Sequence, residues 1–197
     1  MTDEFGVTAW GREWTRLAQP TKIIRPNPAL PRARVLARND NVRDVVLLAG
    51  SVTASVSTSD TSDYRVTVTF PTWDARRSAA AHEVVDGVSD GDLPDTLHAA
   101  LRMRGVSVAP LVDELTAVCG CTQRVRPCVH ILATYFEVAR RIDENPRSGL
   151  LLRGFDPRSM SGASQVTLDD IDPTTFYSQG KTVSAGHSVV HRAALDS

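Results

Sequence analysis

Residues 119–130 read Cys-Gly-Cys-Thr-Gln-Arg-Val-Arg-Pro-Cys-Val-His and contain every cysteine of the 197-residue chain. The pattern is C-x-C, a six-residue loop and C-x-H. Thiolate sulfur and imidazole nitrogen are the ligands that a tetrahedral zinc ion prefers, and two such pairs on a short loop can close around one ion. We therefore predict one structural zinc ion, with four ligands: Cys119, Cys121, Cys128 and His130.

A zinc ion with four protein ligands has no open position for water or substrate, so this motif argues against metal catalysis. Hydrolysis at the site would require one of the four ligands to be missing from the metal. The nucleotide-binding patterns G-x-x-x-x-G-K-[ST] and G-x-G-x-x-G and the metalloprotease pattern H-E-x-x-H do not occur in the chain. We expect a protein that is not an enzyme and has no small-molecule substrate.

The composition is that of an ordinary folded domain, with 42% hydrophobic residues and a formal net charge of -1. This charge gives no overall attraction to nucleic acid or to an anionic membrane. Residues 1–7 lack an apolar signal segment, and the run Val45–Ala49 is far shorter than the ~18 residues of a membrane-spanning helix. We expect a cytoplasmic protein without a membrane partner, where clustered thiols bind metal rather than form disulfides.

Residues 1–115 are predicted to form an α+β region. Trp10, Trp14 and Leu17 fall on one face of a short helix, where they pack in the core or, alternatively, form an exposed platform for a base or a partner. The three prolines of Thr21–Pro31 indicate a linker. Four runs with strand character then predict a small antiparallel meander: Ala33–Ala37, Val42–Ala49, Val52–Ser57 and Tyr64–Phe70.

Two helices follow the meander. The first spans residues 72–89 and is predicted to bury one apolar face, and Asp92 is suited to cap the second, which ends near Gly105. The apolar faces are predicted from Trp73, Ala80, Val84 and Val88 in the first helix and from Leu97, Ala100 and Leu101 in the second. This arrangement places two helices between the sheet and the cysteine motif.

Residues 116–147 are predicted to hold the zinc finger and a helix that begins at Cys128 and ends before Pro146. Its apolar stripe must pack against another part of the chain. Residues 148–197 are predicted to be a flexible tail with a short anchor at 172–177. The fold class is thus α+β, a small antiparallel sheet with packed helices and a Cys3His zinc finger that leads into an amphipathic helix.

The order C-x-C, short loop, C-x-H and amphipathic helix resembles the SWIM zinc finger. Further segments are similar to bacterial SWIM zinc finger proteins, in which a small α+β region precedes the finger: residues 10–14, 33–38, 93–107 and 172–177. The resemblance implies an interaction module for DNA or protein that accompanies a Swi/Snf-type helicase. The loop 122–127 departs from the pattern, because many members carry a tryptophan or a similar residue there.

Arginines supply the support for nucleic acid: Arg124 and Arg126 lie in the loop, and Arg102 and Arg104 precede it. Arginine is suited to phosphate and to guanine edges. Alternatively, arginines of this region pair on a solvated surface with acidic neighbours, which are Asp113, Glu114, Glu137, Asp143 and Glu144. Two functions therefore stay open: a nucleic-acid-binding accessory protein that acts with a helicase-like ATPase, and an adaptor whose finger and tail bind protein alone.

Overall fold

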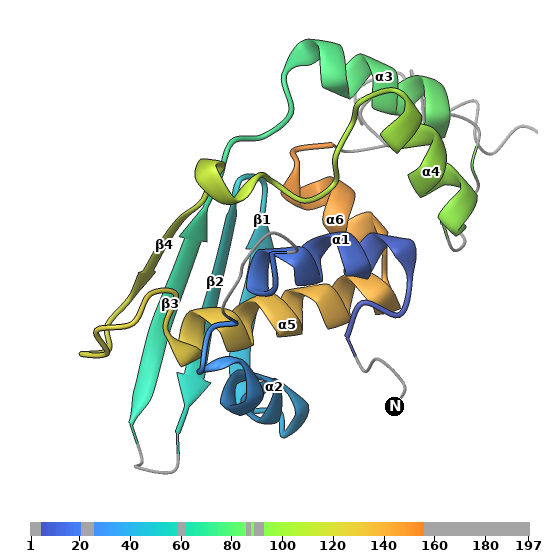
Figure 1. The fold of residues 1–197 in the computed structure, drawn as a ribbon. Coiled ribbons are helices and arrows are strands. Elements are labelled where there is room, and N and C mark those ends of the chain that lie inside the picture. Colours follow the sequence, from blue (N-terminus) through green and yellow to red (C-terminus); the bar gives the residue numbers. More distant parts are fainter. Residues whose placement is uncertain (1–4, 21–25, 59–61, 86–87, 89–92, 156–197) are drawn as a thin grey trace, which may run out of the picture. The chain divides into compact units, whose positions relative to one another are not determined.

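Helix α5, Val129–Glu144, lies against one face of a four-stranded antiparallel sheet, with helices α1 and α2 beside it (Figure 1). This computed structural model describes residues 5–20, 26–58, 62–85, 88 and 93–155, which belong to one compact unit. Because α5 contacts both helices and all four strands, it is the element around which the core closes.

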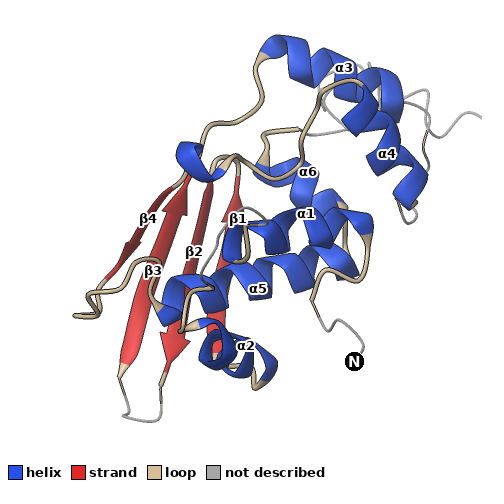
Figure 2. Ribbon diagram, in the orientation of Figure 1, coloured by secondary structure: helices blue, strands red, loops and turns tan. Residues whose placement is uncertain are grey.

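The sheet has the order β1-β2-β3-β4 and is antiparallel throughout (Figure 2). Alternate residues of β2 are buried, and they face the helices together with Val66 and Val68 of β3. The strands are β1 Val42–Leu48, β2 Ser51–Ser57, β3 Asp63–Thr69 and β4 Thr116–Cys119. The predicted α+β class and three predicted strands are confirmed, and β4 brings the first cysteine to the edge of the sheet.

Helix α1, Ala9–Ala18, buries both tryptophans completely, so the exposed aromatic platform is excluded and the core role is confirmed. Trp10 meets His98 edge to face and Trp14 meets Phe70 in the same way. The helix begins where the Thr8 hydroxyl accepts a hydrogen bond from the Gly11 N–H.

The predicted strand at 33–37 is wrong, because this segment lies in helix α2, Leu30–Arg38. Ala33, Leu36 and Ala37 are buried at helical spacing, and Pro31 is tolerated in the first turn. The predicted linker, whose residues 21–25 lie outside the described residues, therefore ends before Leu30. The apolar positions of this five-residue run fit the period of a strand or of a helix, and packing against α5 selects the helix.

Helices α3, Ala75–Val85, and α4, Asp95–Met103, confirm the two predicted helices with shorter bounds. The predicted face is confirmed in part: Trp73 is buried, and Ala80, Val84 and Val88 pack half-buried against the core, whereas the fully buried residues of α3 are Ala81 and Val85. Asp92 lies outside the described residues, and Pro94 precedes the first turn of α4 without a side-chain cap. Gly105, with φ of +72°, ends that segment as predicted.

The predicted start of the tail at residue 148 is wrong. Helix α6, Arg147–Leu152, follows α5, and Leu150, Leu152 and Phe155 are buried. The chain is also fastened by backbone hydrogen bonds from Gly50 N–H to the Leu152 carbonyl and from Trp73 N–H to the Arg153 carbonyl. The remainder of the predicted tail, with its anchor at 172–177, lies outside the described residues.

Candidate metal centre

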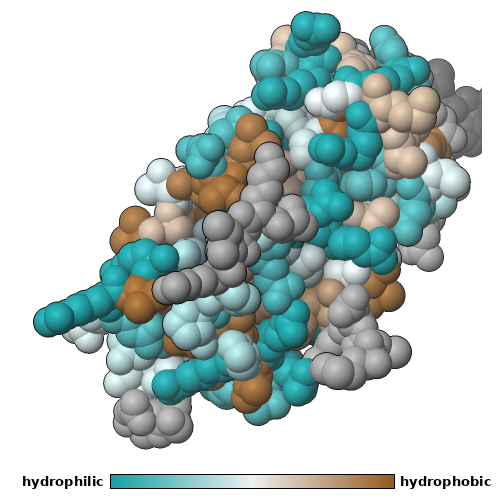
Figure 3. Space-filling model, in the orientation of Figure 1, coloured by the Kyte–Doolittle hydropathy of each residue, from teal (hydrophilic) through white to brown (hydrophobic). Residues whose placement is uncertain are grey.

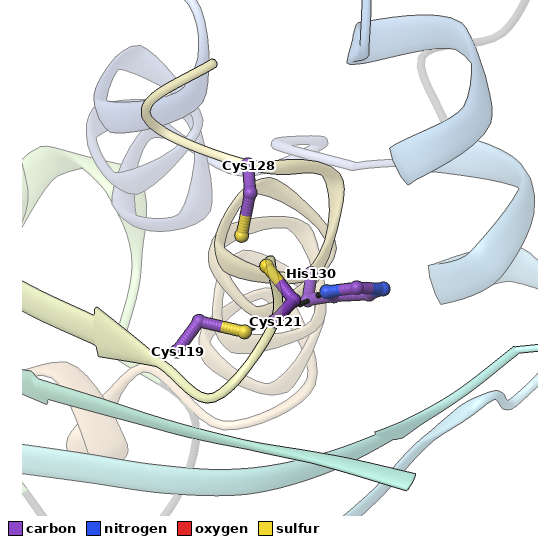
Figure 4. A group of neighbouring side chains, drawn as sticks. All are labelled: Cys119, Cys121, Cys128 and His130. Carbon is purple, nitrogen blue, oxygen red and sulfur yellow. Dashed lines mark hydrogen bonds between the residues drawn. The ribbon is translucent and has the colours of Figure 1, made fainter. Parts of the chain in front are cut away.

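The four predicted ligands come together at the start of α5 (Figure 4). Cys119 ends β4, Cys121 follows the glycine turn, Cys128 is the N-cap of α5, and His130 lies in its first turn. All four side chains are buried, and their ligand atoms lie within 4.8 Å of one another. A short strand and a helix N-terminus therefore hold the two halves of the motif face to face.

One separation between two candidate ligand atoms can be compared directly with a tetrahedral metal site. The Cys119 Sγ lies 3.5 Å from the His130 Nδ1. In a tetrahedral site with bond lengths of about 2.3 Å to sulfur and 2.05 Å to nitrogen, this distance is about 3.6 Å. This pair of atoms is thus close to the separation that a tetrahedral ion would require, and Nδ1 is the histidine atom that would bind it.

The thiols differ in their ionisation. Burial raises the pKa of Cys119 to about 12; the Cys121 backbone N–H opposes this rise, whereas the Cys121 and Cys128 thiols add to it. Burial also opposes ionisation of Cys121, but the Gln123 N–H, hydrogen bonds from the other two cysteines and the charge of Arg126 together outweigh it and lower the pKa of Cys121. Because thiolates this close repel one another, a bound cation is what would allow all of them to ionise together. The donor set therefore fits a divalent metal ion.

His130 is prepared as a neutral ligand. Burial, followed by the positive charge of Arg32, lowers the pKa of His130, which favours the imidazole form that binds metal. The Tyr64 ring stacks on the imidazole, with ring centroids 4.3 Å apart and an interplanar angle of 17°. This stacking from β3 fixes the plane of the ring, as supporting residues do around metal ligands.

Two loop residues support the centre in ways that the motif alone does not reveal. The Gln123 side-chain carbonyl accepts a hydrogen bond from the Val129 N–H at 3.3 Å, which satisfies a free donor at the start of α5. Arg126 Nη1 lies 3.9 Å from the Cys121 Sγ and stabilises its thiolate. Gly120 is not needed for space, since a Cβ there would meet no atom within 4 Å.

The structure does not bring the four candidate nucleic-acid arginines together. Arg102 donates to Glu13 at 3.1 Å and Arg104 pairs with Glu83, both on α4 or directly after it. Arg124 and Arg126 are exposed in the loop beyond β4, which lies far from α4 in Figure 1. The alternative of paired arginines is confirmed for two of the four, with partners other than the predicted acids.

Two further arginines, Arg140 and Arg141 on α5, bind Glu137, which is 1% exposed. Arg140 also pairs with Glu144 at 2.9 Å. These pairs match the predicted acidic partners. Of the arginines discussed, Arg124 and Arg126 are therefore the exposed ones next to the candidate metal centre.

A serine-hydrolase pattern, G-x-S-x-G, occurs at residues 87–91. In hydrolases this serine lies in a turn between a strand and a helix. Here the described elements on either side are both helices, α3 and α4, and only Val88 of the pattern is described. The surrounding structure thus differs from that of a nucleophile turn.

No family model matches the chain, and no solved structure matches it. The chain is 29% identical over 133 residues to the uncharacterized protein Rv2102 of Mycobacterium tuberculosis. The match covers 64% of this chain and 48% of that protein, so the chain spans about half the length of this relative. SWIM membership stays a prediction. Among the described residues, no helix is long and apolar enough to cross a membrane.

Proposed function

We propose that the protein is a zinc-stabilised interaction module of the SWIM type, without enzymatic activity of its own. The observation that carries this proposal is the buried set of four ligand atoms within 4.8 Å, which joins the end of β4 to the start of α5. Three cysteines and one histidine are a donor set typical of structural zinc. Such an ion would stabilise the fold and fix the exposed loop 122–127.

A protein partner is the first candidate. Arg102 and Arg104 are engaged by Glu13 and Glu83, so half of the candidate nucleic-acid set serves the fold. Exposed apolar side chains lie on the same side of the molecule as the loop, among them Val112, Val118 and Val125. A helicase-like ATPase of the Swi/Snf type is the partner that the SWIM resemblance suggests.

Nucleic acid is the second candidate, because Arg124 and Arg126 are exposed on the loop that the metal would hold. Two arginine contacts to phosphate would release about two counterions, which gives a shallow slope of roughly -2 in a plot of log affinity against log salt. Binding of this kind would be weak without help from a partner.

The two candidates are separated by a salt titration of the zinc-loaded full chain with fluorescent duplex and single-stranded DNA. A protein adaptor predicts no saturable binding at 50 mM salt, in roughly the range where phosphate contacts are strongest. The nucleic-acid candidate predicts binding that the double variant Arg124→Glu, Arg126→Glu abolishes. The matched control is Arg76→Glu with Arg77→Glu, the same charge change on α3. DNA binding that is lost only in the loop variant would overturn the adaptor.

The zinc assignment has its own test. Metal analysis of the purified full chain should give one zinc per chain, and Cys128→Ser should lower this value. A chain that folds fully and carries no metal would contradict the proposal.

A further inference from the structure

Among the described residues, strand β4 has one neighbouring strand, β3, and no described strand pairs with its other edge. The Gly120 N–H bonds to the Arg65 carbonyl, and the next partners along the ladder are Val118 with Thr67 and Thr116 with Thr69. Since bonded pairs alternate along an antiparallel ladder, the backbone groups of Ala117 and Cys119 point to the open edge. An edge of this kind is a ready template for another strand.

A cavity of about 460 Å³ lies beside this edge, and its lining is largely apolar. Leu17 of α1, Ile131 and Tyr135 of α5 and Val112 of the 3-10 turn η1, Val112–Glu114, contribute to it. Val112 is 50% exposed and Val118 is 62% exposed. Figure 3 shows apolar side chains gathered where η1 meets β4, so this face offers both free backbone groups and apolar contact area.

The cavity also has a charge preference. Among the described residues that line it, Arg126 is the charged one and none is acidic. Arg124 is exposed nearby in the loop. An occupant with a carboxylate would therefore be favoured over one with a basic side chain.

We propose that β4 accepts an extended, acidic and apolar segment of a partner protein as an additional strand. The segment's backbone would bond to Ala117 and Cys119, alternate apolar side chains would enter the cavity, and a carboxylate would meet Arg126. A helical segment is disfavoured, because it satisfies its own backbone groups and leaves those of β4 unpaired. This inference rests on the proposed protein-interaction function and specifies how the partner binds.

The test begins with a displayed library of random linear twelve-residue peptides, selected against the zinc-loaded full chain. We expect the selected peptides to alternate apolar residues and to carry Asp or Glu. Their affinity is then measured by fluorescence anisotropy. In hydrogen exchange, peptide binding should protect the Ala117 amide, whereas Val118 should change little because β3 already protects it.

Matched peptides and variants test the strand geometry. Two versions of each peptide are compared, one with N-methyl groups on the odd-numbered residues and one with them on the even-numbered residues. The version that blocks the N–H groups facing β4 should bind at least tenfold more weakly, and the other version should bind as tightly as the unmethylated peptide. The variant Ala117→Pro lacks an N–H that points to the open edge, so it should also bind the peptide at least tenfold more weakly. Its metal content and circular dichroism spectrum should stay normal. Arg126→Glu should shift selection from acidic to basic peptides.

Peptides that bind equally with either methylation phase, or that protect no β4 amide, would overturn strand addition while the protein-interaction function stands. Selection that enriches only helical peptides would have the same meaning. The absence of any peptide binding would also overturn strand addition. DNA binding that requires the loop arginines, together with no peptide binding, would overturn the protein-interaction function as well.

Discussion

The two ends of α5 are fixed by different chemistry. At its start, Cys128 and His130 lie with the two other candidate ligands, Cys119 and Cys121. At its last turn, the Asp143 carboxylate accepts hydrogen bonds from Gly6 N–H at 2.7 Å, Thr8 N–H at 2.8 Å and the Thr8 hydroxyl at 2.7 Å. The first end would depend on a metal ion, if the four side chains bind one as proposed. The second end depends on a carboxylate whose hydrogen-bond partners lie 135 residues or more away in the sequence.

The carboxylate end is also the more tightly packed. A Cβ on Gly11 would lie 2.2 Å from the Asp143 Oδ1 and 2.8 Å from the Ala139 carbonyl. Helices α1 and α5 therefore approach so closely that only glycine fits between them. A bound metal would therefore stabilise a local loop, whereas the Asp143 carboxylate stabilises the contact between α1 and α5 across the core.

Removal of metal is expected to have the largest effect. Structural zinc contributes roughly 10–16 kcal/mol of apparent binding free energy at neutral pH. A chelator should therefore increase hydrogen exchange strongly in residues 116–134 and less in 5–18 and 139–144. Exchange measured by mass spectrometry on the full chain, with and without zinc, checks this. Equal increases at both ends of α5 would show that the two ends are one cooperative unit.

Asp143→Ala should cost about 3 kcal/mol of unfolding free energy, because several backbone donors lose a charged acceptor. Urea denaturation with zinc in excess is the measurement. Glu144→Ala serves as the control, since Glu144 is 60% exposed and pairs with Arg140. Its cost should stay below about 1 kcal/mol. Equal losses of unfolding free energy in the two variants would show that Asp143 stabilises the fold no more than an exposed acidic residue does.

Gly11→Ala should lower the free energy of unfolding by about 2 kcal/mol, because the new methyl group must displace Asp143 or separate α1 from α5. Gly120→Ala is the matched change at the metal end, where the Cβ meets open space. Its cost should be below about 0.5 kcal/mol, with zinc affinity unchanged. A larger loss at Gly120 than at Gly11 would reverse the assignment of tight packing to the carboxylate end.

The substitution Glu13→Gln should have the smallest effect and lower the free energy of unfolding by about 1 kcal/mol. Burial opposes its ionisation, but hydrogen bonds from His98 and Ser107 and the charges of His98 and Arg102 outweigh burial and lower the pKa of Glu13. A lowered pKa stabilises the fold above the ordinary value of 4.5, and this stability is lost as the pH falls through the folded-state pKa.

The measurement is the difference in unfolding free energy between the natural chain and Glu13→Gln at pH 7 and at pH 4. The difference should shrink at the lower pH. Since both chains keep the same cysteines, effects of acid on the metal centre cancel in this comparison. A difference that grows as the pH falls would contradict the assigned direction of the pKa shift.

The metal centre was predictable from the sequence because its ligands are local and chemically distinct. Asp143 and Glu13 were not, since their partners lie 85 residues or more away and nothing distinguishes these acids from others in the chain. Segment 33–37 carries apolar positions that fit two periods, and contact with α5 decides between them. Leu150 and Phe155 follow a polar stretch, so their burial appears only when Gly50 and Trp73 bind the same segment.

The position of α5 late in the chain sets the order in which the core can close during synthesis. Helices α1 and α2 and strands β1–β3 all precede it, and each packs against it. Their apolar faces, including the fully buried Trp10 and Trp14, therefore stay without their native partner until Glu144 has left the ribosome. The growing chain therefore exposes these apolar faces until α5 is available to cover them.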